Sequence, residues 1–293
     1  MSDILIPSTY NYIAVFLTFN CNLACSCCIN AYTGINRKRE QLLGEEWVWA
    51  LSRIVGRQDL PITIGGGEPT LHKDFYAIVN ALHEAKLKSK IRSDLDLLTN
   101  ARFNITEFMG CVSPEIFKRS APYASIRVSY HPETMYKDII IAKVRTLLDN
   151  GYRVGIWSVN HPHTQHHLSG FGKECDYRGI DFRLKEFLGM SHGKMYGTYK
   201  YEHSCDGKQY NKKVLCKTSE LIIGPEGNVY RCHADLYEQR EPIGNIMDEK
   251  FVIEDIYRPC GRYGECNPCD VKVKFDRYQI MGHTSVDITE VIC

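Results

Sequence analysis

The sequence of 293 residues predicts an α/β fold built on a parallel sheet, either open or curled into a barrel. As far as Gly189, short apolar β-branched segments alternate with longer segments of helical periodicity, which is typical of parallel strands joined by helices. Beyond Gly189 the chain becomes polar and rich in Tyr, Lys and Cys. We therefore expect a main domain over residues 1–190 and a smaller domain over residues 191–293.

The strands and helices of the main domain follow from these patterns. Six strands are expected, at residues 13–19, 60–64, 95–99, 125–130, 154–160 and 182–187. Helical periodicity covers residues 45–57, 73–86 and 137–150. In the smaller domain, residues 220–231 (ELIIGPEGNVYR) predict a β-hairpin that turns at Pro225 to Asn228.

The composition narrows the classes of function. Thirty-six Lys and Arg against 35 Asp and Glu leave a net charge of +1, which argues against a nucleic-acid partner. No stretch approaches the roughly 18 consecutive apolar residues of a membrane helix, and the first residues lack the pattern of a secretory signal. We expect a soluble cytoplasmic protein with no membrane partner.

Thirteen cysteines favour metal or redox chemistry, because the reducing cytosol keeps thiols available as ligands. They gather in two groups, Cys21 to Cys28 and Cys205 to Cys269, while Cys111, Cys175 and Cys293 stand alone. Two metal sites are the simplest interpretation.

The first group contains the spacing C-x3-C-x2-C at Cys21, Cys25 and Cys28, directly after the first expected strand. Three thiolates can each hold one iron of a cubane, which leaves the fourth iron open for the amino and carboxylate groups of S-adenosylmethionine (SAM). Zinc normally needs four N or S donors, and three ligands in this segment do not meet that need. Cys27 either substitutes as a ligand or packs as a small buried side chain.

A second motif, Gly65-Gly66-Gly67-Glu68-Pro69, follows the second expected strand. Glycines let the backbone approach a ligand closely, although a tight turn at a strand end explains them equally well when the motif is taken alone.

Together the two motifs resemble those of the radical SAM superfamily, in which C-x3-C-x2-C follows the first barrel strand and a GGE motif binds the methionyl amino group. The resemblance implies a partial (β/α)6 TIM-like barrel and a [4Fe–4S] cluster on the three cysteines. It also implies reductive cleavage of SAM to a 5′-deoxyadenosyl radical and a flavodoxin or ferredoxin-type electron donor. Gly66, Gly67 and Glu68 are the implied SAM contacts. Cys27 stands where the family commonly has an aromatic residue.

Polar residues at other strand ends are weaker candidates for the site. Ser129 and Ser158 are the preferred candidates for contacts to the SAM carboxylate or ribose, and Lys185 is a candidate substrate contact. Polar residues at strand ends serve equally well as helix caps or satisfied loop residues.

The second cysteine group offers four thiolates that can complete a cluster with no open iron or form a zinc site. The expected ligands are Cys216, Cys232, Cys266 and Cys269. The unused Cys205 and Cys260 leave room for other ligand sets.

Cys216, then Gly227-x4-Cys232, then a later C-x2-C resembles the twitch domain of radical SAM dehydrogenases, a shortened SPASM domain. This resemblance implies a small C-terminal β-hairpin/helix twitch-like Fe–S domain with one auxiliary [4Fe–4S] cluster. Only Cys293 follows the C-x2-C pair, so one auxiliary cluster is favoured over two.

Three functions compete at this point. The first is an enzyme that abstracts hydrogen from a small-molecule substrate in an oxidation (dehydrogenation) assisted by the auxiliary cluster. Only twenty residues precede Cys21, which leaves no room for a leader-peptide-binding domain and favours a small molecule. The second is a peptide-modifying maturase or epimerase, with Cys111 or Cys205 as hydrogen donor. The third, a non-enzymatic metal or redox-sensing module, leaves the GGE segment unexplained.

Overall fold

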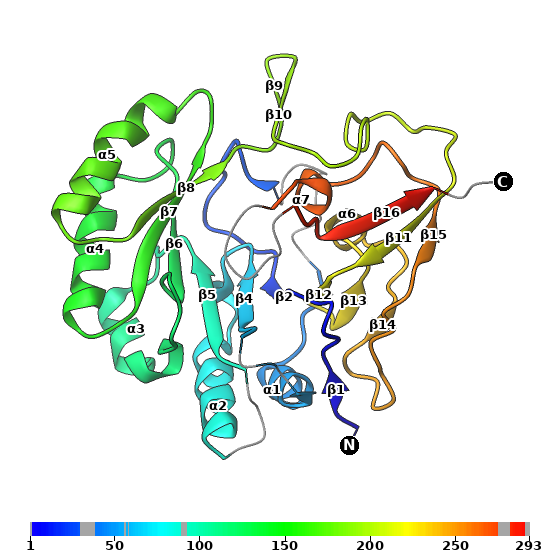
Figure 1. Cartoon of the computed structure of the whole chain (residues 1–293). Helices are drawn as coiled ribbons and strands as arrows, with labels where there is room; N and C mark the ends of the chain where they lie inside the picture. The colour runs from blue at the N-terminus through cyan, green and yellow to red at the C-terminus, as the bar shows by residue number, and fades with distance from the viewer. Residues whose placement is uncertain are drawn as a thin grey trace.

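The computed structural model describes residues 2–29, 39–55, 57, 59–88, 93–274 and 282–290. Its centre is a nine-stranded sheet in the order β14-β13-β12-β2-β4-β5-β6-β7-β8 (Figure 1). Six neighbouring strands run parallel: β2 (Tyr12–Thr18), β4 (Ile62–Gly66), β5 (Leu95–Thr99), β6 (Ile126–Tyr130), β7 (Val154–Asn160) and β8 (Phe182–Glu186). They confirm the six strands predicted from the sequence. Over the described residues the end strands β14 and β8 do not pair, so the sheet does not close into a barrel.

Helices cover one face of the parallel strands. Those predicted are α1 (Gly44–Ser52), α2 (Phe75–Leu87) and α4 (Lys137–Asp149). The structure adds elements that the sequence did not predict: helices α3 (Ile105–Cys111) and α5 (Gln165–Tyr177), and the 3₁₀ turns η2 (Pro69–Leu71) and η3 (Pro114–Phe117). Trp47 of α1, Ile78 of α2 and Phe171 of α5 are buried in one core with Ile13 and Val15 of β2. No helix of the described segments is long and apolar enough to cross a membrane.

Helix α1 is shorter than predicted because the chain turns into a strand. The short strands β1 (Ile4–Leu5) and β3 (Ile54–Val55) pair in parallel, so residues 54 and 55 leave the helical path. Ile4 and Ile54, one from each strand, are fully buried in the same core.

The segment after residue 190 adds to the central sheet. Strand β12 (Glu220–Ile223) pairs in parallel with β2, and β13 (Asn228–Tyr230) returns antiparallel to β12, as the predicted hairpin requires. Strand β14 (Gly244–Asn245) completes this edge. The division of the chain near residue 190 stays a prediction.

A second, three-stranded antiparallel sheet lies in the order β15-β11-β16. Its strands are β15 (Arg258–Cys260), β11 (Val214–Thr218) and β16 (Val286–Glu290), and the short helices α6 (His233–Glu238) and α7 (Pro268–Val271) lie nearby (Figure 1). Strands β9 (Gly189–Ser191) and β10 (Lys194–Tyr196) form a projecting hairpin. The sequence analysis predicted neither unit.

The face of the parallel sheet opposite the helices carries a buried ion-pair network. Leu95 and Leu97 of β5 face the helical core, so the alternation of strand side chains turns Asp96 the other way. Asp96 Oδ2 accepts hydrogen bonds of 2.9 Å from both Arg119 and Arg127, and all three side chains are buried. The positive charges of two guanidinium groups thus offset the unfavourable burial of the Asp96 carboxylate at this face.

Candidate functional site

The first cysteine group forms a loop at the C-terminal end of β2. The amide of Cys28 donates to the carbonyl of Cys25 at 3.2 Å, which closes a turn between them. Burial raises the pKa of Cys25 to about 12 and that of Cys27 to about 11, because a buried thiolate without a bound cation is unfavourable. The twelve cysteines of the described chain form no disulfide. Within the described residues, no three or more His, Cys, Asp and Glu side chains converge as a metal site.

Neighbouring strand ends brace this loop. Glu133, after β6, accepts from both the amide and the hydroxyl of Ser26, and the Cys25 sulfur lies 3.8 Å from the Thr134 hydroxyl. Asn100, after β5, donates to the sulfur of Cys21 at 3.8 Å and to Asn22 at 2.8 Å. The sequence analysis missed Glu133 and Thr134, whose only signal is that they follow an expected strand.

The GGE turn docks onto the chain that leads into the cysteine loop. The amide of Gly67 donates to Thr18 at 2.7 Å, and that of Glu68 donates to Asn20 at 2.8 Å. A Cβ at Gly67 would overlap the carbonyl oxygen of Asn20, and Gly66 has a φ of +133°, which favours glycine. The glycines are therefore needed for contact with the protein's own backbone.

Glu68 is fully buried, and its carboxylate joins the ends of β4 and β5. It accepts hydrogen bonds from the hydroxyls of Thr70 at 2.6 Å and Thr99 at 2.7 Å, and from the amide of Asn100 at 2.7 Å. Burial raises the pKa of Glu68, while these donors oppose the rise. Contacts of Gly66, Gly67 and Glu68 with SAM stay predictions.

A small pocket lies beside the cysteine loop, and its walls include Cys27, His131, Ser158 and His161. The Ser158 hydroxyl donates to the carbonyl of Tyr130 at 2.8 Å. Burial lowers the pKa of both histidines, which favours their neutral forms. Of the two serines expected to contact SAM, the structure brings Ser158 to this pocket.

The other candidates predicted from the sequence do not line that pocket. Ser129 of β6 pairs with Trp157. Lys185 of β8 is exposed, and its charge helps to lower the pKa of His131. Cys111 is exposed at the end of α3, beside Val112, whose carbonyl accepts from Tyr152 just before β7. Cys111 therefore lies near the N-terminal ends of the parallel strands, whereas the cysteine loop lies at their C-terminal ends.

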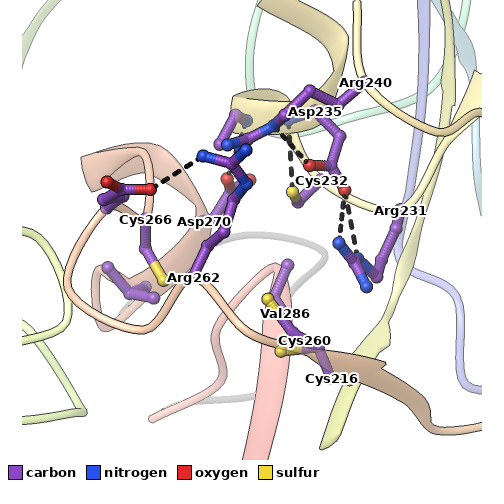
Figure 2. Close-up of a pocket in the computed structure, with 13 residues that line it drawn as sticks. Cys216, Arg231, Cys232, Asp235, Arg240, Cys260, Arg262, Cys266, Asp270 and Val286 are labelled. Atoms are coloured by element: carbon purple, nitrogen blue, oxygen red, sulfur yellow. Dashed lines mark hydrogen bonds and ion pairs between the residues drawn. The ribbon is translucent and has the colours of Figure 1, made fainter. Parts of the chain in front are cut away.

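The second cysteine group surrounds a pocket between the three-stranded sheet, α6 and α7 (Figure 2). Four of its lining residues are Cys216, Cys232, Cys260 and Cys266. Figure 2 shows the side chains of Cys216 and Cys260 next to each other, and their interaction lowers the pKa of the Cys260 thiol. Cys269, which the sequence analysis expected among the ligands, does not line the pocket. Cys205 is buried outside it, and Cys293 lies outside the described residues.

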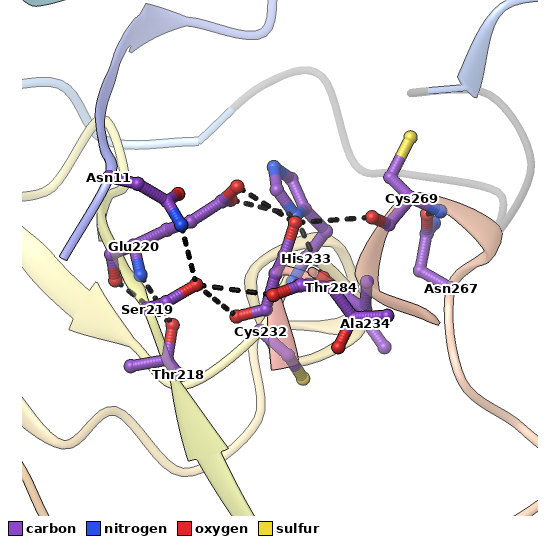
Figure 3. Close-up of polar contacts among 12 residues, drawn as sticks. Asn11, Thr218, Ser219, Glu220, Cys232, His233, Ala234, Asn267, Cys269 and Thr284 are labelled. Carbon is purple, nitrogen blue, oxygen red and sulfur yellow. Dashed lines mark hydrogen bonds and ion pairs between the residues drawn. The ribbon is translucent and has the colours of Figure 1, made fainter. Parts of the chain in front are cut away.

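A buried polar network lies behind this pocket (Figure 3). Glu220 accepts from Lys274, and from the Ser285 hydroxyl at 2.7 Å. Asp270 lies 2.8 Å from Nδ1 of His233 and accepts from the His233 amide at 2.9 Å. Although burial opposes it, this partnership raises the pKa of His233. The network joins β12, α6 and α7.

Comparisons with known sequences place the main part of the chain in a protein family. Residues 15–162 match the sequence model of the Radical SAM superfamily. The PqqA peptide cyclase of Ruegeria pomeroyi is 31% identical over 94 residues, which are 32% of this chain and 25% of that protein.

Solved structures share the fold. Streptococcus suis SuiB bound to its precursor peptide SuiA has a TM-score of 0.55 at 16% identity, covering 84% of this chain and 64% of that one. The structure of anSMEcpe with AdoMet and the Kp18Cys peptide has a TM-score of 0.55 at 16% identity, covering 82% and 78%. The chain thus matches a quarter of the length of the peptide cyclase and about two thirds of that of SuiB. Because the family match spans just over half of the sequence, this chain belongs to the radical SAM superfamily of enzymes.

Proposed function

We propose that this enzyme holds a [4Fe–4S] cluster on Cys21, Cys25 and Cys28, cleaves SAM there, and acts on a peptide. The observation that carries the cluster assignment is the joint placement of the three-cysteine loop and the GGE turn at adjacent strand ends, joined by backbone hydrogen bonds. Three thiol donors suit a cubane that keeps one iron open to a ligand, and in this proposal Cys27, which lines the adjacent pocket, is not one of them. When bound, the cluster and SAM supply one electron and a 5′-deoxyadenosyl radical that abstracts a substrate hydrogen.

The protein's part in this chemistry is to hold the loop and orient SAM. Glu133 and Asn100 fix the two ends of the loop, while the Gly66–Gly67 turn fixes the chain that enters it. The Ser158 hydroxyl donates its hydrogen to the carbonyl of Tyr130, so its oxygen can still accept a hydrogen bond from a hydroxyl of the SAM ribose. Ser129 remains the second candidate for that contact.

The peptide substrate rests on the relatives. The sequence alone favours a small molecule over a peptide. The curated relative is named a peptide cyclase, and both solved structures were determined with a peptide bound. These names support the second candidate for this chain.

We extend the proposal to one auxiliary [4Fe–4S] cluster in the pocket of Figure 2. Cys216, Cys232 and Cys266, three of the four ligands expected from the sequence, line that pocket. Sulfur donors suit an iron–sulfur cluster, and a four-cysteine zinc site is the competing outcome.

The test uses enzyme reconstituted anaerobically with iron and sulfide, dithionite as electron donor, and SAM. We expect 5′-deoxyadenosine to form, and its formation to rise with candidate peptides encoded by neighbouring genes, which should also change in mass. A parallel set of small metabolites is the comparison. Turnover that responds to a metabolite and to none of the peptides would overturn the peptide assignment and restore the first candidate.

A further inference from the structure

We infer that Cys260, and not Cys269, is the fourth ligand of the auxiliary site. The resulting ligand set is Cys216, Cys232, Cys260 and Cys266. The inference rests on the proposed auxiliary cluster and names the thiolates that bind it.

Strand pairing holds Cys260 beside Cys216. In the antiparallel pair of β11 and β15, Val214 is directly opposite Cys260. Cys216 follows Val214 by two residues and therefore shares its face, which makes Cys216 and Cys260 diagonal neighbours. Figure 2 shows the two side chains next to each other. The pairing of β11 with β15 thus places both cysteines at the same pocket.

Arg231 connects the segments that carry Cys232 and Cys260. Its Nη1 donates to the carbonyl of Pro259 at 2.8 Å, while its Nε and Nη2 donate to Asp235 of α6 at 3.1 and 2.7 Å. Arg231 precedes Cys232, and Pro259 precedes Cys260, so one side chain ties the two segments together. The amide of Asp235 donates to the Cys232 sulfur at 3.4 Å, which orients that thiol as well.

Cys269 is held on another side of the same network. Figure 3 shows its sulfur pointing away from that of Cys232. Its neighbour Asp270 makes three contacts with α6, to the amides of His233 and Ala234 and to the His233 ring, which fix helix α7. These contacts hold the backbone segment that carries Cys269.

The backbone of Cys269 is held in the same network. Its carbonyl accepts a hydrogen bond from the Ser285 hydroxyl at 3.2 Å, and that hydroxyl also lies 2.7 Å from the carboxylate of Glu220. The two residues of the C-x2-C pair thus lie in different surroundings, with Cys266 at the auxiliary pocket and Cys269 outside its lining.

The test starts from a variant in which Cys21, Cys25 and Cys28 are all Ala, so that any remaining cluster belongs to the auxiliary site. Iron, sulfide and zinc contents and Mössbauer spectra are then measured after adding Cys260→Ala, Cys269→Ala or, as a control far from the pocket, Cys111→Ala at the end of α3. We expect about four irons per chain in the starting variant, in Cys269→Ala and in Cys111→Ala, and loss of the cluster in Cys260→Ala. Circular dichroism checks that each variant is folded.

The outcomes separate the two proposals. Starting protein without iron, or with zinc in its place, overturns the auxiliary cluster itself. Iron that survives Cys260→Ala overturns the ligand assignment and leaves the cluster standing. Loss of iron in Cys269→Ala also overturns the assignment, and this arm decides the matter even if Cys260→Ala fails to fold.

Discussion

The carboxylate of Glu133 accepts two hydrogen bonds from Ser26, one from the backbone amide at 2.7 Å and one from the hydroxyl at 2.8 Å. Ser26 lies between Cys25 and Cys27, so this contact anchors the cysteine loop to the loop that follows β6. Hydrogen bonds thus connect two loops that are more than a hundred residues apart in sequence, at the C-terminal ends of the parallel strands.

This contact predicts that Glu133→Ala weakens retention of the first cluster. Each lost bond at this exposed site is worth about 1 kcal/mol, so the release of iron should accelerate by roughly five- to thirtyfold. The release is followed by absorbance with a ferrous chelator. The matched control is Glu115→Ala, which removes an exposed carboxylate paired with Lys118. Equal release rates for the two variants would contradict the anchoring role.

Glu68→Gln should weaken the protein and its binding of SAM while the cluster is retained. The carboxylate accepts from Thr70, Thr99 and Asn100, and an amide keeps only one acceptor oxygen and turns an NH₂ toward one of these donors. We expect a loss of about 2 kcal/mol in unfolding free energy, because a buried donor is left without its partner. Chemical denaturation and a SAM titration measure the two effects. Unchanged values in both would remove Glu68 from the site.

The network around Asp96 predicts a large and local effect on stability. Asp96→Asn leaves Arg119 and Arg127 buried without their shared carboxylate, which should cost about 3–5 kcal/mol. Asp149→Asn, which breaks an exposed pair with Arg145 in α4, should cost less than about 0.5 kcal/mol. Urea unfolding of the two variants tests the contrast, and similar losses would contradict it.

The buried His131 predicts how stability depends on pH. Burial lowers its pKa in the folded protein, with Glu133 opposing and Lys185 adding to the shift. The unfolded chain then binds the proton more readily, so stability is full above the ordinary value of 6.5 and declines as the pH falls through it. The wild type should lose more stability between pH 7 and pH 5 than His131→Gln. Parallel curves of unfolding free energy against pH would rule this out.

The sequence was sufficient for the elements whose signal is local. The parallel strands are apolar β-branched segments such as Ile13 to Leu17, and they were found because both faces are covered. Helix α5 was missed because only Leu168, Phe171 and Cys175 of its thirteen residues are buried, and two glycines weaken its helical propensity.

The parts of the site that were missed depend on pairing between distant segments. Glu133 reaches the cysteine loop only because β2 and β6 are parallel, so that their C-terminal ends lie on the same side of the sheet. Cys260 lies beside Cys216 through the register of β11 and β15, which no spacing along the chain reveals. Our proposal replaces Cys269, which the C-x2-C spacing predicts, with Cys260, because a local pattern along the chain cannot say which sulfurs face the same pocket.

The central claim is that Cys21, Cys25 and Cys28 hold the cluster that cleaves SAM. The most direct measurement is the rate of 5′-deoxyadenosine formation by reconstituted enzyme in Cys25→Ala and Cys27→Ala, two changes of the same kind two residues apart. Losing one of three thiolates removes an iron's anchor, so Cys25→Ala should abolish SAM cleavage, while Cys27→Ala should retain it. Full activity of Cys25→Ala, or loss of activity confined to Cys27→Ala, would contradict the assignment.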